Sequence, residues 1–384
     1  MTATTATAYG GRTAVRPYRA EVIGSLLRPP AVKEAMRDAD EGKLDRAALD
    51  RIQDRAILDA VRLQDACGLD TFTDGEYRRR IFWDPIIAAL DGLDADYVSP
   101  VKFGAAQSPG GTPARDDVRL PAVTGKLALR ESLLQRELRY LLAHTDRPAA
   151  AKATMPAMAQ ASALWLPGVS EGAYPTREEF VADLVEIMRG EIAALVDMGV
   201  RYIQLDSPRY TYACSEEGRD RLRALGIDPE PWLGEMIAFD NALIAGFEGV
   251  TFGLHLCRGN HRSMWAVEGG YDPIAEQLFN QLKVDRLLLE YDTPRAGTFA
   301  PLRYVPEDKV VVLGLISTKE ARVETREEIL PRIEEAARYV PIERLALSPQ
   351  CGFASTLPGN LLGEDEQRRK LELVGSLARE VWNA

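Results

Sequence analysis

Four residues with metal-binding side chains lie in the second half of the chain. They are His255, Cys257, Glu290 and Cys351. One imidazole, two thiolates and one carboxylate form a donor set that suits tetrahedral Zn²⁺. His255 and Cys257 are two residues apart, so their side chains point to the same side of a β-strand. Because a structural zinc usually takes its ligands from local knuckles, a set drawn from three separate segments is typical of a catalytic zinc.

A plainer interpretation of these residues stays open. A single Cys or His in a strand is most often a core residue. The other two cysteines, Cys67 and Cys214, are predicted to be free thiols. Four scattered cysteines are too few for a disulfide scaffold, which indicates a reducing compartment.

Eight short apolar segments, rich in β-branched residues, alternate with segments of helical spacing. They cover residues 20–26, 69–75, 150–155, 201–206, 250–257, 286–292, 310–316 and 344–350. Helices are predicted over 45–66, 176–198, 233–246, 324–338 and 363–382, and Thr176 with Glu179 forms a capping box. Eight strands alternating with helices predict an α/β fold, a single (β/α)₈ TIM barrel. A doubly wound open sheet is the alternative, which is disfavoured because no G-x-G-x-x-G follows any strand.

Two stretches depart from this alternation. Residues 1–17 have no apolar period and are predicted to form a disordered N-terminal arm. Residues 95–130 are rich in Pro and Gly, and include a β-like stretch at 121–127. We interpret 95–130 as an excursion inserted after the second strand of a barrel domain that covers 18–384.

Reactive residues gather where the predicted strands end. Catalytic residues of a TIM barrel lie at these C-terminal strand ends. The strand ends carry Gly24 and Ser25, Glu76, Asp206, the four metal-ligand candidates, and Ser317-Thr318-Lys319. Arg209 and Tyr210, which follow Asp206, are candidates to line a pocket. Phe82 and Trp83 are candidates for an apolar pocket wall, with core packing the favoured interpretation.

The composition is that of an ordinary globular protein. The 384 residues are 46% hydrophobic and 27% charged, with a net charge of −11. An acidic chain is a poor partner for nucleic acid or for an anionic membrane surface. The sequence contains no apolar run of the ~20 residues that cross a bilayer, and its first residues lack the apolar region of a signal peptide. We therefore expect a cytoplasmic protein with small-molecule partners, and the sequence predicts no particular oligomeric state.

Seven motifs follow one another in the order seen in cobalamin-independent methionine synthase. They are VIGSLLRP, DGEYRR, QLDSP, GLHLCRGN, LLLEYD, GLISTK and LSPQCGF. From about residue 20 onward the chain resembles the C-terminal catalytic barrel of that family, as in its shorter single-barrel members.

The resemblance implies a role for each matching residue. His255, Cys257, Glu290 and Cys351 match the zinc ligands. Glu76 and Asp206 match two carboxylates that hold the amino group of homocysteine. Ser25 matches a residue that contacts the carboxylate of this amino acid, and Gly24 matches its neighbour. A methyltetrahydrofolate is the methyl donor that the resemblance implies.

Three departures from the family pattern affect the half of the site that binds the methyl donor. The family's I-H-S-P run, which carries a histidine acid, is replaced by Ser317-Thr318-Lys319, so Lys319 is the predicted proton donor. No aromatic residue occurs between the strand at 150–155 and Trp165, where the family places a tryptophan. The basic pair after the last zinc ligand is also missing.

These observations lead to one main hypothesis. The chain is predicted to be a zinc-dependent S-methyltransferase that activates a small thiol as the thiolate, and homocysteine is the favoured thiol. Glu290 is predicted to loosen when the substrate sulfur binds, because oxygen is the poorest match to thiol-rich zinc. A zinc-dependent transfer from another electrophile, such as an epoxide, and a thioether-cleaving reaction are alternatives. A non-catalytic zinc or thiol-binding module would have a closed four-ligand site without an adjacent pocket.

Overall fold

The computed structural model describes residues 18–103 and 116–383. The predicted N-terminal arm, 1–17, lies outside the described residues. The α-helices are α1 (Pro30–Asp40), α2 (Arg46–Ala66), α3 (Asp84–Ile87), α4 (Leu133–Ala143), α5 (Met158–Ala161), α6 (Arg177–Asp197), α7 (Glu216–Ala224), α8 (Pro229–Ile244), α9 (Asp272–Gln281), α10 (Arg326–Ala336) and α11 (Glu364–Trp382). The strands are β1 (Leu90–Phe103), β2 (Asp116–Leu129), β3 (Lys152–Pro156), β4 (Tyr202–Asp206), β5 (Thr251–Leu256), β6 (Arg286–Glu290), β7 (Val310–Ile316) and β8 (Leu345–Pro349).

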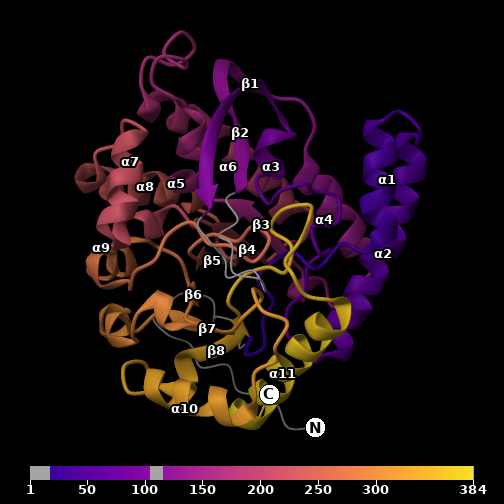
Figure 1. Ribbon diagram of the computed structural model, residues 1–384, viewed down its shortest axis with the longest axis vertical. Helices are drawn as coiled ribbons and strands as arrows, with labels where there is room; N and C mark the ends of the chain where they lie inside the picture. Colours follow the sequence, from indigo (N-terminus) through magenta and orange to yellow (C-terminus); the bar gives the residue numbers. More distant parts are fainter. Residues whose placement is uncertain (1–17, 104–115, 384) are drawn as a thin grey trace.

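Six strands form one parallel sheet in the order β3-β4-β5-β6-β7-β8 (Figure 1). They match the third to eighth predicted strands. Their residues are buried almost throughout, as expected for a parallel sheet that is covered on both faces. The register places His255 of β5 beside Asp206 of β4 and beside Leu288 of β6. Side chains near the strand ends are therefore brought to one edge of the sheet.

The prediction of continuous strands over 20–26 and 69–75 is wrong, although both segments lie at the edges of the sheet. Ala20 forms an isolated parallel bridge with Leu347 of β8, and Phe72 forms one with Ala151, next to β3. The two segments also meet each other, because the Asp70 N–H donates to the Ala20 carbonyl over 2.8 Å. The ring of eight segments closes through these contacts. Each segment has one such bridge and no regular ladder, and the second segment ends in a turn where Gly75 and Glu76 have φ of 71° and 57°.

The predicted helices are confirmed with small shifts at their ends. The segment predicted over 176–198 contains α6, whose N-cap is Thr176, and the Thr176 hydroxyl accepts the Glu179 N–H over 3.2 Å. Phe180, Leu184 and Met188 on its apolar face are buried. The segments at 45–66, 233–246, 324–338 and 363–382 form α2, α8, α10 and α11.

The predicted excursion contains the hairpin of β1 and β2, which pair antiparallel. The β-like stretch 121–127 lies within β2. In Figure 1 the hairpin stands at one end of the molecule, and α10 and α11 lie at the other. Leu120 and Val123 of β2 are buried in the main hydrophobic core, which anchors the hairpin to the barrel.

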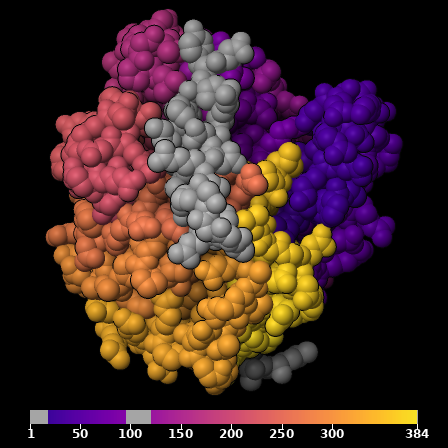
Figure 2. All heavy atoms as spheres, viewed as in Figure 1, coloured from indigo at the N-terminus to yellow at the C-terminus, as the bar shows by residue number. Residues whose placement is uncertain are grey.

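Segments from the two ends of the chain also pack together. α11 contacts α2, and the space-filling view shows the indigo α1–α2 region beside the yellow C-terminal segment (Figure 2). Among the described residues, no helix has the length and apolar character that a membrane span requires.

Candidate active site

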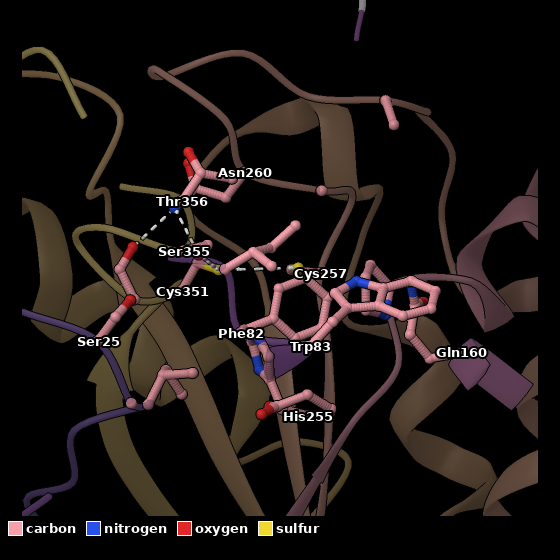
Figure 3. Close-up of a pocket in the computed structure, with 18 of the residues that line it drawn as sticks. Ser25, Phe82, Trp83, Gln160, His255, Cys257, Asn260, Cys351, Ser355 and Thr356 are labelled. Carbon is pink, nitrogen blue, oxygen red and sulfur yellow. Dashed lines mark hydrogen bonds between the residues drawn. The ribbon is translucent and has the colours of Figure 1, made fainter. Parts of the chain in front are cut away.

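Three of the four predicted metal ligands converge in a buried cluster. The ligand atoms of His255, Cys257 and Cys351 lie within 4.8 Å of one another (Figure 3). The two sulfurs are 3.7 Å apart. A tetrahedral zinc with Zn–S bonds of about 2.3 Å separates two sulfurs by about 3.8 Å. The spacing of the two thiols therefore fits a shared zinc ion.

The imidazole of His255 is oriented for metal binding. Its Nδ1 lies 3.2 Å from the Leu288 carbonyl oxygen. Because a carbonyl only accepts hydrogen bonds, Nδ1 carries the proton in the neutral ring. The other nitrogen, Nε2, is buried without a hydrogen-bond partner. Metal-binding histidines commonly donate one ring N–H to a carbonyl and direct the other nitrogen to the ion.

The predicted fourth ligand, Glu290, is placed differently. Its Oε2 accepts the Arg258 backbone N–H over 2.8 Å, and its Oε1 accepts from Arg295 Nη2 over 2.9 Å. Burial raises the pKa of Glu290, but the nearby Arg295, Lys319 and Arg258 outweigh burial and hold this pKa below its ordinary value. The carboxylate is thus ionised and engaged by arginine, outside the three-ligand cluster. Its role as a ligand stays a prediction.

Glu76 presents a carboxylate oxygen to the same site. Its Oε1 accepts from Thr154 Oγ1 over 2.8 Å, and its Oε2 is buried without a partner. Gly24 packs directly against this carboxylate, because a Cβ at position 24 would lie 2.5 Å from Glu76 Oε1. The buried, unpaired oxygen is suited to accept from a cationic group of a ligand.

Asp206 and Ser25 complete the predicted amino-acid site. Asp206 ends β4, and its Oδ1 accepts from Gln204 Nε2 over 2.7 Å. Burial raises the pKa of Asp206 to about 7. The Ser25 hydroxyl accepts the Ala354 N–H over 3.2 Å, which fixes its position beside the segment that carries Cys351.

Most of these predicted residues line one cavity, whose space together with its open mouth is about 760 Å³. The predicted residues on its wall are Gly24, Ser25, Glu76, Asp206, His255, Cys257 and Cys351. Lys319 is not on this wall. Its buried ammonium donates to the Gly259 carbonyl over 2.8 Å and to Asn260 Oδ1 over 3.1 Å. Lys319 therefore holds the loop at Gly259 and Asn260, which lines the cavity. Its role as a proton donor stays a prediction.

The cavity also has an apolar wall, which was the less favoured of the two interpretations of Phe82 and Trp83 in the sequence. Phe82 and Trp83, expected mainly in the core, both line it, and their rings meet edge to face at 5.8 Å. Leu120 of the hairpin lines it as well. The available signal was the position of the aromatic pair shortly after Glu76. Of the two candidates after Asp206, Arg209 lines the cavity, while the Tyr210 hydroxyl donates to Asp240 over 2.6 Å.

Comparison with known proteins shows the family of this chain. The family described as "Cobalamin-independent synthase, Catalytic domain" matches residues 19–360. This chain belongs to the cobalamin-independent methionine synthase family. The chain is 37% identical over 370 residues to the uncharacterized protein YxjH of Bacillus subtilis, covering 95% of each chain. It is 24% identical over 335 residues to a methionine synthase of Saccharolobus solfataricus, covering 86% of this chain and 87% of that one.

A solved structure extends the likeness to three dimensions. The putative vitamin-B12-independent methionine synthase of Listeria monocytogenes superposes with a TM-score of 0.71 at 29% identity. The match covers 96% of this chain and 99% of that chain. The predicted family and the TIM-barrel fold are confirmed, and family membership supports a methyltransferase.

Proposed function

We propose that this protein is a zinc-dependent S-methyltransferase that methylates a small thiol, and that this thiol is homocysteine. The observation that carries the proposal is a single cavity whose wall holds three convergent zinc-ligand side chains and an unpaired buried carboxylate oxygen. A non-catalytic zinc site is closed by its ligands. Here the ligand cluster opens instead onto space for a ligand.

Four residues of the chain would hold the metal. His255, Cys257 and Cys351 are the firm ligands of this proposal, and Glu290 is the weakest, because Arg295 competes for its carboxylate. Bound to such a donor set, Zn²⁺ supplies the Lewis acidity that keeps a substrate thiol deprotonated near neutral pH. The thiolate is the form of sulfur that attacks carbon.

The remaining polar residues would recognise the ends of a zwitterionic amino acid. Glu76 Oε2 and Asp206 would accept hydrogen bonds from the ammonium, and Ser25 would donate to the carboxylate. Asp206, with its pKa raised to about 7, would act as a full anion only above that pH. A thiol without an ammonium would leave the buried Glu76 Oε2 without a hydrogen-bond partner, which favours an amino-acid thiol.

The transfer itself joins sulfur to carbon in one substitution. The substrate sulfur attacks the methyl carbon, the bond from this carbon to its carrier atom breaks, and the electron pair leaves with the carrier. The thiol proton balances the charge that the carrier gains. Phe82 and Trp83 would exclude water from the reacting atoms, and a methyltetrahydrofolate is one candidate carrier. An epoxide, or thioether cleavage in reverse, would use the same thiol-binding residues.

Zinc X-ray absorption spectroscopy with and without homocysteine tests the proposal. We expect zinc in the purified protein and an additional Zn–S contact on adding homocysteine. Cys257→Ser and Cys351→Ser should lose zinc and methyl transfer together, whereas Cys67→Ser, which changes a buried thiol outside the cavity, should lose neither. Full zinc occupancy in both ligand variants, or coordination unchanged by homocysteine, would contradict the proposal. Mass-spectrometric turnover of homocysteine against methyl donors and epoxides then identifies the electrophile.

A further inference from the structure

Arg209 is a buried cation on the cavity wall that has no anion beside it. It lies three residues after Asp206 and lines the same cavity. The residue is 2% exposed, and its Nε and Nη1 are buried without hydrogen-bond partners. In the described part of the chain, no carboxylate lies within ion-pair distance of its guanidinium. Its neighbour is the ring of Tyr212, whose centroid is 5.3 Å from the guanidinium carbon.

Other buried arginines of this protein have partners. Arg28 donates to the backbone carbonyls of Glu76, Arg79 and Ala354. Arg79 pairs with Glu137 at 2.7 Å. Burial lowers the pKa of Arg209, but a guanidinium stays protonated in proteins and still needs hydrogen-bond acceptors, of which an anion binds it most strongly. The exception is thus the arginine that lines the cavity, which indicates that a ligand supplies the missing anion.

The position of Arg209 separates it from the proposed amino-acid site. Its backbone N–H donates to Gln160 Oε1 over 3.1 Å. Apart from burial, the one group that shifts the pKa of Arg209 is Tyr212, whereas the pKa of Asp206 is affected by His255, Glu76 and Cys351. Ser25, which we assign to the carboxylate of homocysteine, is held beside Ala354 in the segment that carries Cys351. The guanidinium of Arg209 therefore lies apart from the groups that we assign to homocysteine. The anion at Arg209 belongs to the second substrate.

We infer that the methyl donor carries an oxyanion, a carboxylate or a phosphate, on an apolar body, and that Arg209 binds this group. The inference rests on the proposed function and specifies its unknown substrate. Phe82, Trp83 and Leu120 would contact the apolar body. The oxyanion at Arg209 would fix one end of the donor so that its methyl group faces the sulfur. Arg209 is thus a specificity residue for the donor and takes no part in binding the thiol.

Calorimetric titration of the purified full-length protein tests this inference without turnover. The probes are 3-(methylthio)propionate, inorganic phosphate and the uncharged 3-(methylthio)propan-1-ol. We expect one of the two anions to bind the wild type about tenfold or more tighter than the alcohol, the size of a charge-assisted hydrogen bond. Tight binding of 3-(methylthio)propionate indicates a donor with a carboxylate. Tight binding of inorganic phosphate without tight binding of 3-(methylthio)propionate indicates a donor with a phosphate. Equal binding of all three probes would overturn the inference, even if homocysteine still changes the zinc spectrum.

Variants of two arginines provide the control. Arg209→Met should remove the preference for the anion, and Arg209→Lys should keep part of it. Arg177→Met is the matched control, because Arg177 is also a buried arginine beside an aromatic ring. Arg177 stacks over Trp165, but it also donates to the Leu225 carbonyl over 2.9 Å. This control should keep the preference and lose thermal stability. Without ligand, Arg209→Met should melt at or above the wild-type temperature, because it removes an unpaired buried charge. A lower melting temperature than that of Arg177→Met would show that Arg209 holds the fold and would refute the inference.

Discussion

The contact between Gly24 and Glu76 makes the proposed ammonium site open to a sharp test by Gly24→Ala. An added Cβ would lie 2.5 Å from Glu76 Oε1, and real Cβ atoms essentially never come closer than 3.0 Å to such an atom. The carboxylate must therefore move by at least about 0.5 Å. It has little room to do so, because Thr154 Oγ1 holds the same oxygen at 2.8 Å and the Glu76 backbone has a φ of 57°.

Two effects of different size follow from this displacement. Overpacking a buried site costs about 1–3 kcal/mol of folding stability. Losing the alignment of an ammonium with a buried carboxylate costs a charge-assisted hydrogen bond, about 1.5–3 kcal/mol. We therefore expect the Kd for homocysteine to rise about tenfold or more, with a smaller fall in the melting temperature. Glu76→Asp in the Gly24→Ala background should recover stability, because its shorter side chain avoids the added methyl group.

Titration calorimetry with homocysteine and denaturant unfolding measure the two effects. Gly190→Ala is the matched control, because no atom lies within 4 Å of a Cβ added at this position in α6. It should leave homocysteine affinity unchanged and add up to about 1 kcal/mol of stability. If Gly24→Ala binds homocysteine as tightly as the wild type, Glu76 does not hold the ammonium and the substrate assignment is wrong.

Further predictions address charge and metal. The pKa of Asp206, raised by burial to about 7, means that the carboxylate is about one-tenth ionised at pH 6 and about nine-tenths ionised at pH 8. The affinity for methionine, which has the ammonium but no titrating thiol, should therefore fall about tenfold from pH 8 to pH 6 in calorimetry, whereas Asp206→Asn should bind weakly at both. Arg79→Met leaves Glu137, 0% exposed, without its partner at 2.7 Å and should cost about 3–5 kcal/mol in urea unfolding; Arg79→Met with Glu137→Leu should cost less, and equal losses would exclude an ion-pair effect. Removing the metal with a chelator should lower the melting temperature of the wild type but not that of Cys351→Ser, and an identical shift in both would place the metal elsewhere.

The strand-and-helix pattern made most of the fold predictable from the sequence. Six of the eight predicted strands are present because their apolar, β-branched residues are buried on both faces of a parallel sheet. The convergence of His255, Cys257 and Cys351 followed from the rule that strand ends meet at one edge of the barrel. The first two strands were overestimated because their apolar residues are buried like those of a strand, although each segment pairs with its neighbour in the sheet through a single bridge.

The contacts of long charged side chains were harder to predict from the sequence. Glu290 sits at a strand end, as predicted, yet its carboxylate pairs with Arg295, and Lys319 binds Gly259 and Asn260. These partners come from loops whose approach depends on packing across the whole barrel. The contribution of Leu120 to the apolar cavity wall was missed for the same reason, since Leu120 comes from a hairpin that lies outside the repeating strand-and-helix pattern.

The two halves of the cavity are therefore built in physically different ways. In the half assigned to the thiol, the metal-ligand candidates and Asp206 lie on or directly after ladder strands, where hydrogen bonds fix Asp206 of β4 beside His255 of β5. Ser25 and Glu76 follow the two segments that join the sheet by single bridges. The half assigned to the donor uses Arg209 after β4, the aromatic pair after Glu76, and Leu120 of the hairpin. Loops accept sequence change far more readily than a buried parallel ladder does. A relative that keeps the strand-end residues but replaces Arg209 should therefore methylate the same thiol from a donor without the anionic group, and exchanging the loop after β4 should transfer the donor preference with it.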